Sequence, residues 1–208
     1  STLLANSPAG WNNDRLYLPT EVSDLSKLPV NPPTGGWESL NANTAKKVSV
    51  PGTVEEYMTV SDWPQPTDFS GVSWWFRTLD IPKDLKDATF ILEFGAVRMR
   101  AEVYLDGQLV AYDIVGETPF EANVTKAIRP GEKQLLAVRV TNPGGNFHWQ
   151  DFDVMNWGKY LIPPGRGFGG ILGDVNLKAL NPVYISDIYM QNTPQKTKVN
   201  AIISIRNL

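Results

Sequence analysis

Apolar and polar side chains alternate along residues 90–112, and this alternation predicts two strands joined by a tight turn. Ala101 and Val103 alternate with polar neighbours, so small and branched apolar groups fall on one face of a strand. Asp106-Gly107 separates the two runs, and a type I′ turn needs the positive φ angles that Asp tolerates and Gly adopts freely. A hairpin alone is marginal in water, so we expect it to pair within a larger sheet.

The same period of two recurs in several runs separated by turn residues, and their density predicts an all-β antiparallel sandwich or jelly roll. Apolar residues on both faces of the first run are typical of a central strand. The runs are Ser73–Ile81, Phe90–Phe94, Pro119–Val124 and Gln134–Thr141. Helices should be few and short. The spacing of Thr53 and Glu56 has the form of a capping box and predicts a brief helix through Met58.

Residues 1–46 are rich in Pro, Asn, Ser and Gly and show no sustained period, which predicts an extended arm packed on the sandwich. Trp11 and Trp37 are isolated aromatic residues in this arm. They could form platforms for a ligand, but single aromatic side chains in an irregular segment more often anchor it to the domain surface. We therefore expect Trp11 and Trp37 to be anchors.

Composition limits the classes of partner that this chain is expected to bind. The 208 residues carry a formal net charge of -3 without basic clusters, which argues against nucleic acid or an anionic membrane. The sequence contains no apolar run long enough to span a membrane and no signal segment. Cysteine is absent, so a metal would need carboxylates and His148. One histidine without spaced partners is weak evidence, and we expect neither a metal nor a cofactor.

The order of the motifs resembles the N-terminal sugar-binding-type domain of glycoside hydrolase family 2, which includes β-galactosidases, β-glucuronidases and β-mannosidases. The motifs are VPGTVEEYM, GVSWWFRTLDIP, LEFGAVRMRAEVYLDGQLV, TPFEANVT and LLAVRVTN. The resemblance implies a jelly roll of the galactose-binding-domain-like type, followed by an immunoglobulin-like domain and a TIM barrel that carries two catalytic glutamates. It also implies export, periplasmic or secreted. None of that barrel is present in this sequence.

The segment from Asn142 to Leu177 is the strongest candidate for a binding site, because aromatic and acidic residues are concentrated in a loop bounded by Gly and Pro. A flat ring can cover the C–H face of a sugar, and a carboxylate can accept hydrogen bonds from neighbouring hydroxyls. The candidate substrate-binding residues are His148, Trp149, Asp151, Asp153 and Trp157. The alternative interpretation is that the rings simply pack and that the aspartates cap turns.

The family resemblance implies that a loop of this domain places an aspartate on the substrate, just before a strand that begins Gly-Ile. Asp151 best matches that aspartate, and residues 169–177, which begin Gly169-Gly170-Ile171, match the strand. The chain inserts MNWGKYLIPPG between them, so Asp153 is a competing match. Asp151 and Asp153 could also form an acid and base pair, but alternate residues of an extended segment point to opposite sides. We expect no catalytic residue in this chain.

Asn181-Pro182 marks a boundary, and two further alternating runs follow it, Val183–Met190 and Val199–Ile205. They resemble the first strands of the family's immunoglobulin-like domain. Two strands cannot enclose a core, so we expect the chain to be a fragment. The expected organisation is an arm over 1–46, a jelly roll over 47–181 and truncated strands over 182–208.

We expect a non-catalytic β-sandwich from a family 2-like enzyme, which binds carbohydrate weakly alone and hydrolyses β-linked carbohydrate only with the missing C-terminal domains. One alternative is a free-standing carbohydrate-binding module. A second is a structural or adhesive interaction domain, if the loop around Trp149 is merely packed. The sequence leaves open the sugar, the linkage and the oligomeric state.

Overall fold

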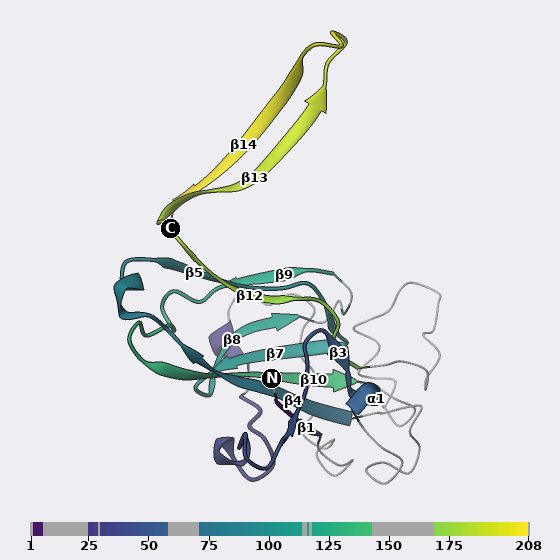
Figure 1. Ribbon diagram of the computed structural model, residues 1–208, viewed down its shortest axis with the longest axis vertical. Coiled ribbons are helices and arrows are strands. Elements are labelled where there is room, and N and C mark those ends of the chain that lie inside the picture. The colour runs from purple at the N-terminus through teal and green to yellow at the C-terminus, as the bar shows by residue number, and fades with distance from the viewer. Residues whose placement is uncertain are drawn as a thin grey trace.

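A computed structural model describes residues 2–5, 25–28, 30–57, 71–113, 116, 118–142 and 169–207. Antiparallel strands form a sandwich of two layers, as predicted (Figure 1). Helical segments in the described residues are short: η2 (Leu25–Lys27), η3 (Trp37–Ser39), α1 (Val54–Tyr57) and η4 (Lys83–Leu85). Because strands dominate both layers, the hydrogen bonds that hold the fold are mostly between segments distant in the sequence.

One layer is a six-stranded sheet with the order β2-β1-β4-β10-β7-β8. Its strands are β1 (Thr2–Ala5), β2 (Lys46–Lys47), β4 (Gly71–Asp80), β7 (Arg100–Leu105), β8 (Gln108–Asp113) and β10 (Lys133–Asn142). All its neighbours pair antiparallel. The strand β4 lies between β1 and β10, which agrees with the central position predicted from its apolar residues.

The facing layer contains two three-stranded sheets, with the orders β12-β5-β9 and β3-β11-β6. Their strands are β3 (Gly52–Thr53), β5 (Thr89–Phe94), β6 (Val97–Arg98), β9 (Phe120–Asn123), β11 (Gly170–Ile171) and β12 (Val175–Leu180). Because β6 follows β5 and β12 follows β11 within a few residues, the two sheets are successive parts of one layer.

The predicted hairpin is confirmed, since β7 pairs with β8 on either side of Asp106 and Gly107. Asp106 has φ 46° and Gly107 has φ 83°, the left-handed values that the turn requires. The Asp106 carboxylate accepts hydrogen bonds from the Leu135 N–H at 2.8 Å and from Arg129 at 2.6 Å. The turn is therefore held against β10 as well as closed by its own backbone geometry.

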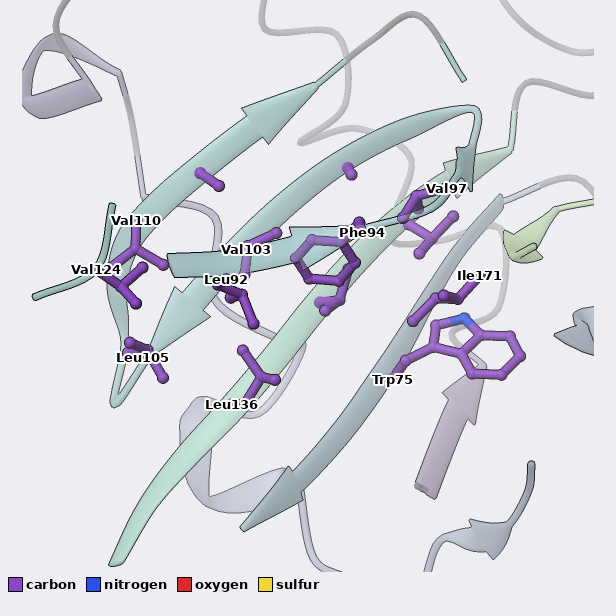
Figure 2. Packing of buried hydrophobic residues seen from close by; sticks show 14 of the residues in the cluster. Trp75, Leu92, Phe94, Val97, Val103, Leu105, Val110, Val124, Leu136 and Ile171 are labelled. Atoms are coloured by element: carbon purple, nitrogen blue, oxygen red, sulfur yellow. The ribbon is translucent and has the colours of Figure 1, made fainter. Parts of the chain in front are cut away.

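The main hydrophobic core fills the space between the two layers (Figure 2). The six-stranded sheet contributes alternate residues, among them Trp75, Val103, Leu105, Leu136 and Val138. The facing layer contributes Phe90, Leu92, Phe94, Val97 and Ile171. This burial of apolar surface is the dominant favourable term for the fold. It also explains why Ala101 and Val103 are small or branched, since they are fully buried between the layers.

A second apolar cluster covers the opposite face of the six-stranded sheet, where residues 25–40 pack on it. The Trp37 ring lies 5.6 Å from Trp74 and 5.0 Å from Tyr104, measured between ring centroids. A Cβ atom added to Gly107 would lie 3.1 Å from the Trp37 ring, so the turn and the ring are in close contact. Both faces of the six-stranded sheet are therefore covered, and β4 and β7 bury residues on each side.

The hairpin of β13 (Val183–Asn192) and β14 (Val199–Asn207) extends away from the sandwich (Figure 1). Its apolar side chains are half or more exposed, including Ile185, Ile188 and Ile205. Arg206 forms an ion pair with Glu121 of β9 at 2.9 Å. The two runs predicted after Asn181-Pro182 thus form strands, and they pair with each other over most of their length.

No helix in the described part of the chain is long and apolar enough to cross a membrane.

Candidate functional site

The predicted site residues lie outside the described residues, so their side chains are not placed. They are His148, Trp149, Asp151, Asp153 and Trp157. The structure describes the two ends of the segment that carries them, at Asn142 and Gly169. The position of these ends decides where on the sandwich the segment begins and returns.

The first end is the last residue of β10. Asn142 pairs with Gly71, the first residue of β4, and Thr141 pairs with Arg100 at the start of β7. The N–H of Met99 also donates to the Thr141 carbonyl at 3.4 Å. Thr141 is thus paired with strands on both sides, and Asn142 is paired with β4.

The second end returns through Gly169 into β11, which lies between β3 and β6. The Gly169 carbonyl accepts a hydrogen bond from the Val54 N–H at 2.8 Å. Gly170 has φ +152°, and a Cβ atom there would lie 2.4 Å from the carbonyl oxygen of Gly52. The backbones of β11 and β3 thus approach so closely that only glycine fits at position 170.

The short helix α1 supports this second end. The predicted capping box is confirmed, because the Glu56 N–H donates to the Thr53 hydroxyl and the Thr53 N–H donates to the Glu56 carboxylate, each at 3.4 Å. Glu55 lies in the same turn, and both of its carboxylate oxygens lie 3.4 Å from the Gly169 N–H, which donates to them. The capped turn therefore also carries the carboxylate that binds the returning chain.

Beneath the first end lies a buried polar cluster, composed of Asn31, Glu102, Tyr104, Arg139 and Thr141. Arg139 donates to the Glu102 carboxylate at 2.5 Å and to the Thr141 hydroxyl at 3.3 Å. Asn31 donates its side-chain N–H to Glu102 at 2.5 Å and its backbone N–H to the Tyr104 hydroxyl at 3.2 Å. The cluster joins β7, β10 and the N-terminal segment.

Burial shifts the pKa values of the ionisable groups in this cluster. It raises the pKa of the Glu102 carboxyl to about 7, although the charge of Arg100 and hydrogen bonds from Asn31 and Tyr104 act to lower it. Burial also lowers the pKa of the Arg139 guanidinium to about 9 and raises that of the Tyr104 hydroxyl. Because Glu102 is only 1 % exposed, its carboxyl is not available to a ligand and its role is structural.

No group of acidic and histidine side chains within the described residues is arranged to hold a metal ion. The described part of the site is the base from which the segment between Asn142 and Gly169 begins and to which it returns. Sequence reasoning identified the glycine strand and the capping box of this base, but it missed the contacts of Glu55, Asn31 and Arg139. The carboxylate contacts join residues 37 to 114 positions apart, so no local pattern could have revealed them.

Comparison with known proteins identifies a family. Residues 25–177 match the family model described as "Glycosyl hydrolases family 2, sugar binding domain". A β-glucuronidase from Formosa agariphila is 27% identical over 169 residues, which are 78% of this chain and 17% of the relative. A β-galactosidase from Thermoanaerobacter pseudethanolicus is 27% identical over 183 residues, 86% of this chain and 22% of the relative. The chain therefore spans only about a fifth of the length of these relatives.

Solved structures show the same fold. A β-glucuronidase from Faecalibacterium prausnitzii superposes with a TM-score of 0.63 at 22% identity, covering 98% of this chain and 34% of that chain. One from an uncultured Clostridium species gives a TM-score of 0.62 at 23% identity, covering 81% of this chain and 29% of that chain.

Proposed function

Because this chain belongs to glycosyl hydrolase family 2 as a sugar-binding domain, we propose that it is the non-catalytic N-terminal part of an enzyme that hydrolyses β-linked carbohydrate. The match to the family over residues 25–177 is the observation that carries the proposal. The relatives named above are a β-glucuronidase and a β-galactosidase, and both are several times longer than this chain. The reaction would then belong to a catalytic barrel elsewhere in the same polypeptide.

The role of this domain is to support the barrel and to lend it the loop between Asn142 and Gly169. Two features favour this role. Both ends of the loop are held in the sandwich, by β4 at Asn142 and by β3 and Glu55 at Gly169. The loop also carries Trp149 and Asp151, residue types suited to a sugar ring and its hydroxyls. A loop with fixed ends can present such groups at low entropic cost.

The proposed organisation has three parts, an arm over 1–46, a jelly roll over 47–181 and the opening strands of an immunoglobulin-like domain over 182–208. The exposed apolar residues of β13 and β14 support the last part, because a two-stranded sheet needs further strands to bury them. The ion pair between Arg206 and Glu121 would then connect the second domain to the first.

The coding sequence downstream of Leu208 tests the proposal. A reading frame that continues into a barrel with two glutamates placed for glycoside hydrolysis is the expected result. A stop codon directly after Leu208 would refute it and favour a free-standing carbohydrate-binding module.

A second test uses the chain itself. Nitrophenyl β-glucuronide and β-galactoside should not be hydrolysed by residues 1–208, and monosaccharides should bind no better than about millimolar, because the other walls of the site belong to the barrel. Micromolar binding in a calorimetric titration would contradict the proposal. So would turnover that is lost when Asp151 is replaced by alanine.

A further inference from the structure

Four buried polar residues form a continuous chain of hydrogen bonds that joins the N-terminal segment, residues 25–40, to the end of β10. Asn31 donates from Nδ2 to Oε1 of Glu102 at 2.5 Å. The second oxygen of that carboxylate, Oε2, accepts a hydrogen bond from Nη1 of Arg139 at 2.5 Å. The same Nη1 donates to the Thr141 hydroxyl at 3.3 Å. We call Asn31, Glu102, Arg139 and Thr141 the polar relay.

The polar relay is removed from water along its whole length. The exposed fractions of its four residues lie between 1% and 5%. At such sites a hydrogen bond is stronger than in water, and a polar group that loses its partner costs free energy. Because the two oxygens of Glu102 bind different neighbours, the carboxylate links Asn31 to Arg139. Loss of the Asn31 amide would leave the buried carboxylate with one donor fewer, so Glu102 and Arg139 would rearrange.

The N-terminal segment is attached to the sheet by packing as well as by the polar relay. The Trp37 ring lies 5.6 Å from Trp74 and 5.0 Å from Tyr104, measured between ring centroids. Leu40 is buried in the same apolar cluster. The backbone N–H of Asn31 donates to the Tyr104 hydroxyl at 3.2 Å, and this contact does not need the side chain. The Asn31 amide can therefore be removed while the other attachments of the segment remain.

The other end of the polar relay lies at the base of the loop between Asn142 and Gly169, the proposed substrate loop. Thr141 directly precedes Asn142, which is the last residue of β10. The Thr141 carbonyl accepts the Met99 N–H at 3.4 Å, which is long for a backbone hydrogen bond. The contact between the Thr141 hydroxyl and Arg139 is thus a further restraint on this end of the strand.

We propose that Asn31 is a positioning residue for the proposed substrate loop. It acts through the polar relay, because its amide holds the Glu102 carboxylate, and this carboxylate holds Arg139 against the Thr141 hydroxyl. The inference rests on the proposed function, which assigns the loop to the substrate. The N-terminal segment would then influence turnover without contacting the substrate.

The first test uses residues 1–208 labelled with ¹⁵N and needs no enzyme activity. Asn31→Ala should shift the amide resonances of Thr141 and Asn142. Leu40→Ala is the matched control, because the same segment loses buried packing but keeps the polar relay, and these two resonances should stay in place. Thr141→Val removes the hydroxyl and keeps a side chain of similar shape. Adding Asn31→Ala to Thr141→Val should produce no further shift at Asn142.

The second test uses the full-length enzyme that the proposed function predicts. Asn31→Ala should lower kcat/KM about tenfold at a temperature where circular dichroism shows the variant to be folded, because a displaced binding group slows turnover. Most of the loss should be in kcat, since the proposed contact of the loop strengthens as charge develops on the sugar ring. Leu40→Ala should be less stable but keep its kcat/KM.

Four outcomes would overturn the inference. The first is that Asn31→Ala leaves the resonances of Thr141 and Asn142 unchanged. The second is equal shifts in Leu40→Ala, which would indicate general loosening of the segment. The third is a full further shift when Asn31→Ala is added to Thr141→Val, and the fourth is a normal kcat/KM for the folded Asn31→Ala enzyme.

Failure of the proposed function gives a different result. A reading frame without a barrel would refute the substrate role of the loop. The NMR measurement would still show whether Asn31 positions Asn142, because it does not depend on a barrel.

Discussion

Arg139 and Glu102 form a buried ion pair 2.5 Å apart, with side chains that are 3% and 1% exposed. The pair lies between adjacent strands, since the two residues are opposite each other in the register of β10 and β7. Asn31 binds the same carboxylate from the N-terminal segment. Because two strands and a distant segment meet at one carboxyl group, loss of that group should affect all three.

We predict that Glu102→Ala lowers the free energy of unfolding by about 3 to 5 kcal/mol at pH 8, because it leaves the Arg139 charge buried without its partner. The double variant Glu102→Leu with Arg139→Met should recover most of this loss, since it removes both charges. Urea denaturation of both variants measures the difference. As a control, Glu132→Gln breaks an exposed ion pair with Arg129 and should have little effect. A double variant as unstable as Glu102→Ala would show that the pair is needed for more than charge balance.

The raised pKa of Glu102 predicts that stability depends on pH. The carboxyl has a pKa of about 7 when folded and an ordinary value of 4.5, so between these values the folded state binds more protons than the unfolded state. The stabilisation that comes from protonation of Glu102 is therefore fully present below about pH 4.5 and is lost as pH rises toward 7, by up to about 3 kcal/mol.

Urea denaturation between pH 4.5 and pH 8 measures this dependence. Glu102→Gln should remove it, because the amide does not titrate. If that variant fails to fold, the ¹³C shift of the Glu102 carboxyl in the unmodified chain gives its pKa directly. Titration at pH 4 to 5 would contradict the prediction.

Much of the fold could be predicted from local patterns. Asp106-Gly107 specified a turn, and Thr53 with Glu56 specified a helix start, because both signals act within a few residues. The burial of Glu102 could not be predicted in this way. Alternation along β7 places it opposite the main core, and its partner Asn31 is 71 residues distant in the sequence. Residues 25–40 pack on that face and Asn31 binds the Glu102 carboxylate, so the burial of Glu102 depends on a segment distant in the sequence.

In the candidate site, too, the sequence predicted local features but not those that depend on tertiary contacts. Residues 169–177 were predicted to form one strand, whereas the structure divides them between β11 and β12. The close approach of Gly170 to Gly52 depends on tertiary pairing. The roles of Asp151 and Asp153 stay predictions, since both lie outside the described residues. The sequence can identify an aromatic ring and a carboxylate as candidates for sugar binding. The direction of each side chain depends on tertiary contacts, which the sequence pattern does not contain.

Gly170→Ala should destabilise the chain by more than about 3 kcal/mol, because its Cβ would lie 2.4 Å from the backbone carbonyl of Gly52. Gly36→Ala is the matched control. Gly36 has φ +81° but no atom within 4 Å of an added Cβ, so its cost should be only the roughly 1 to 2 kcal/mol of a left-handed backbone. Thermal or urea unfolding compares the two. Equal losses would mean that the β3 and β11 backbones can move apart.

In the full-length enzyme that we propose, Asp151 reaches a hydroxyl of the substrate. Its hydrogen bonds would strengthen as positive charge develops on the sugar ring, so Asp151→Asn should lower kcat/KM by the equivalent of about 2 to 4 kcal/mol. Thermal stability should change little. If Asp151 instead caps a turn, the variant should lose about 1 kcal/mol of stability and keep normal kinetics. Asp153→Asn is the matched control, because it removes the same charge two residues away. A kcat/KM near that of the unmodified enzyme for Asp151→Asn would refute the assignment, and a loss confined to Asp153→Asn would move it to Asp153.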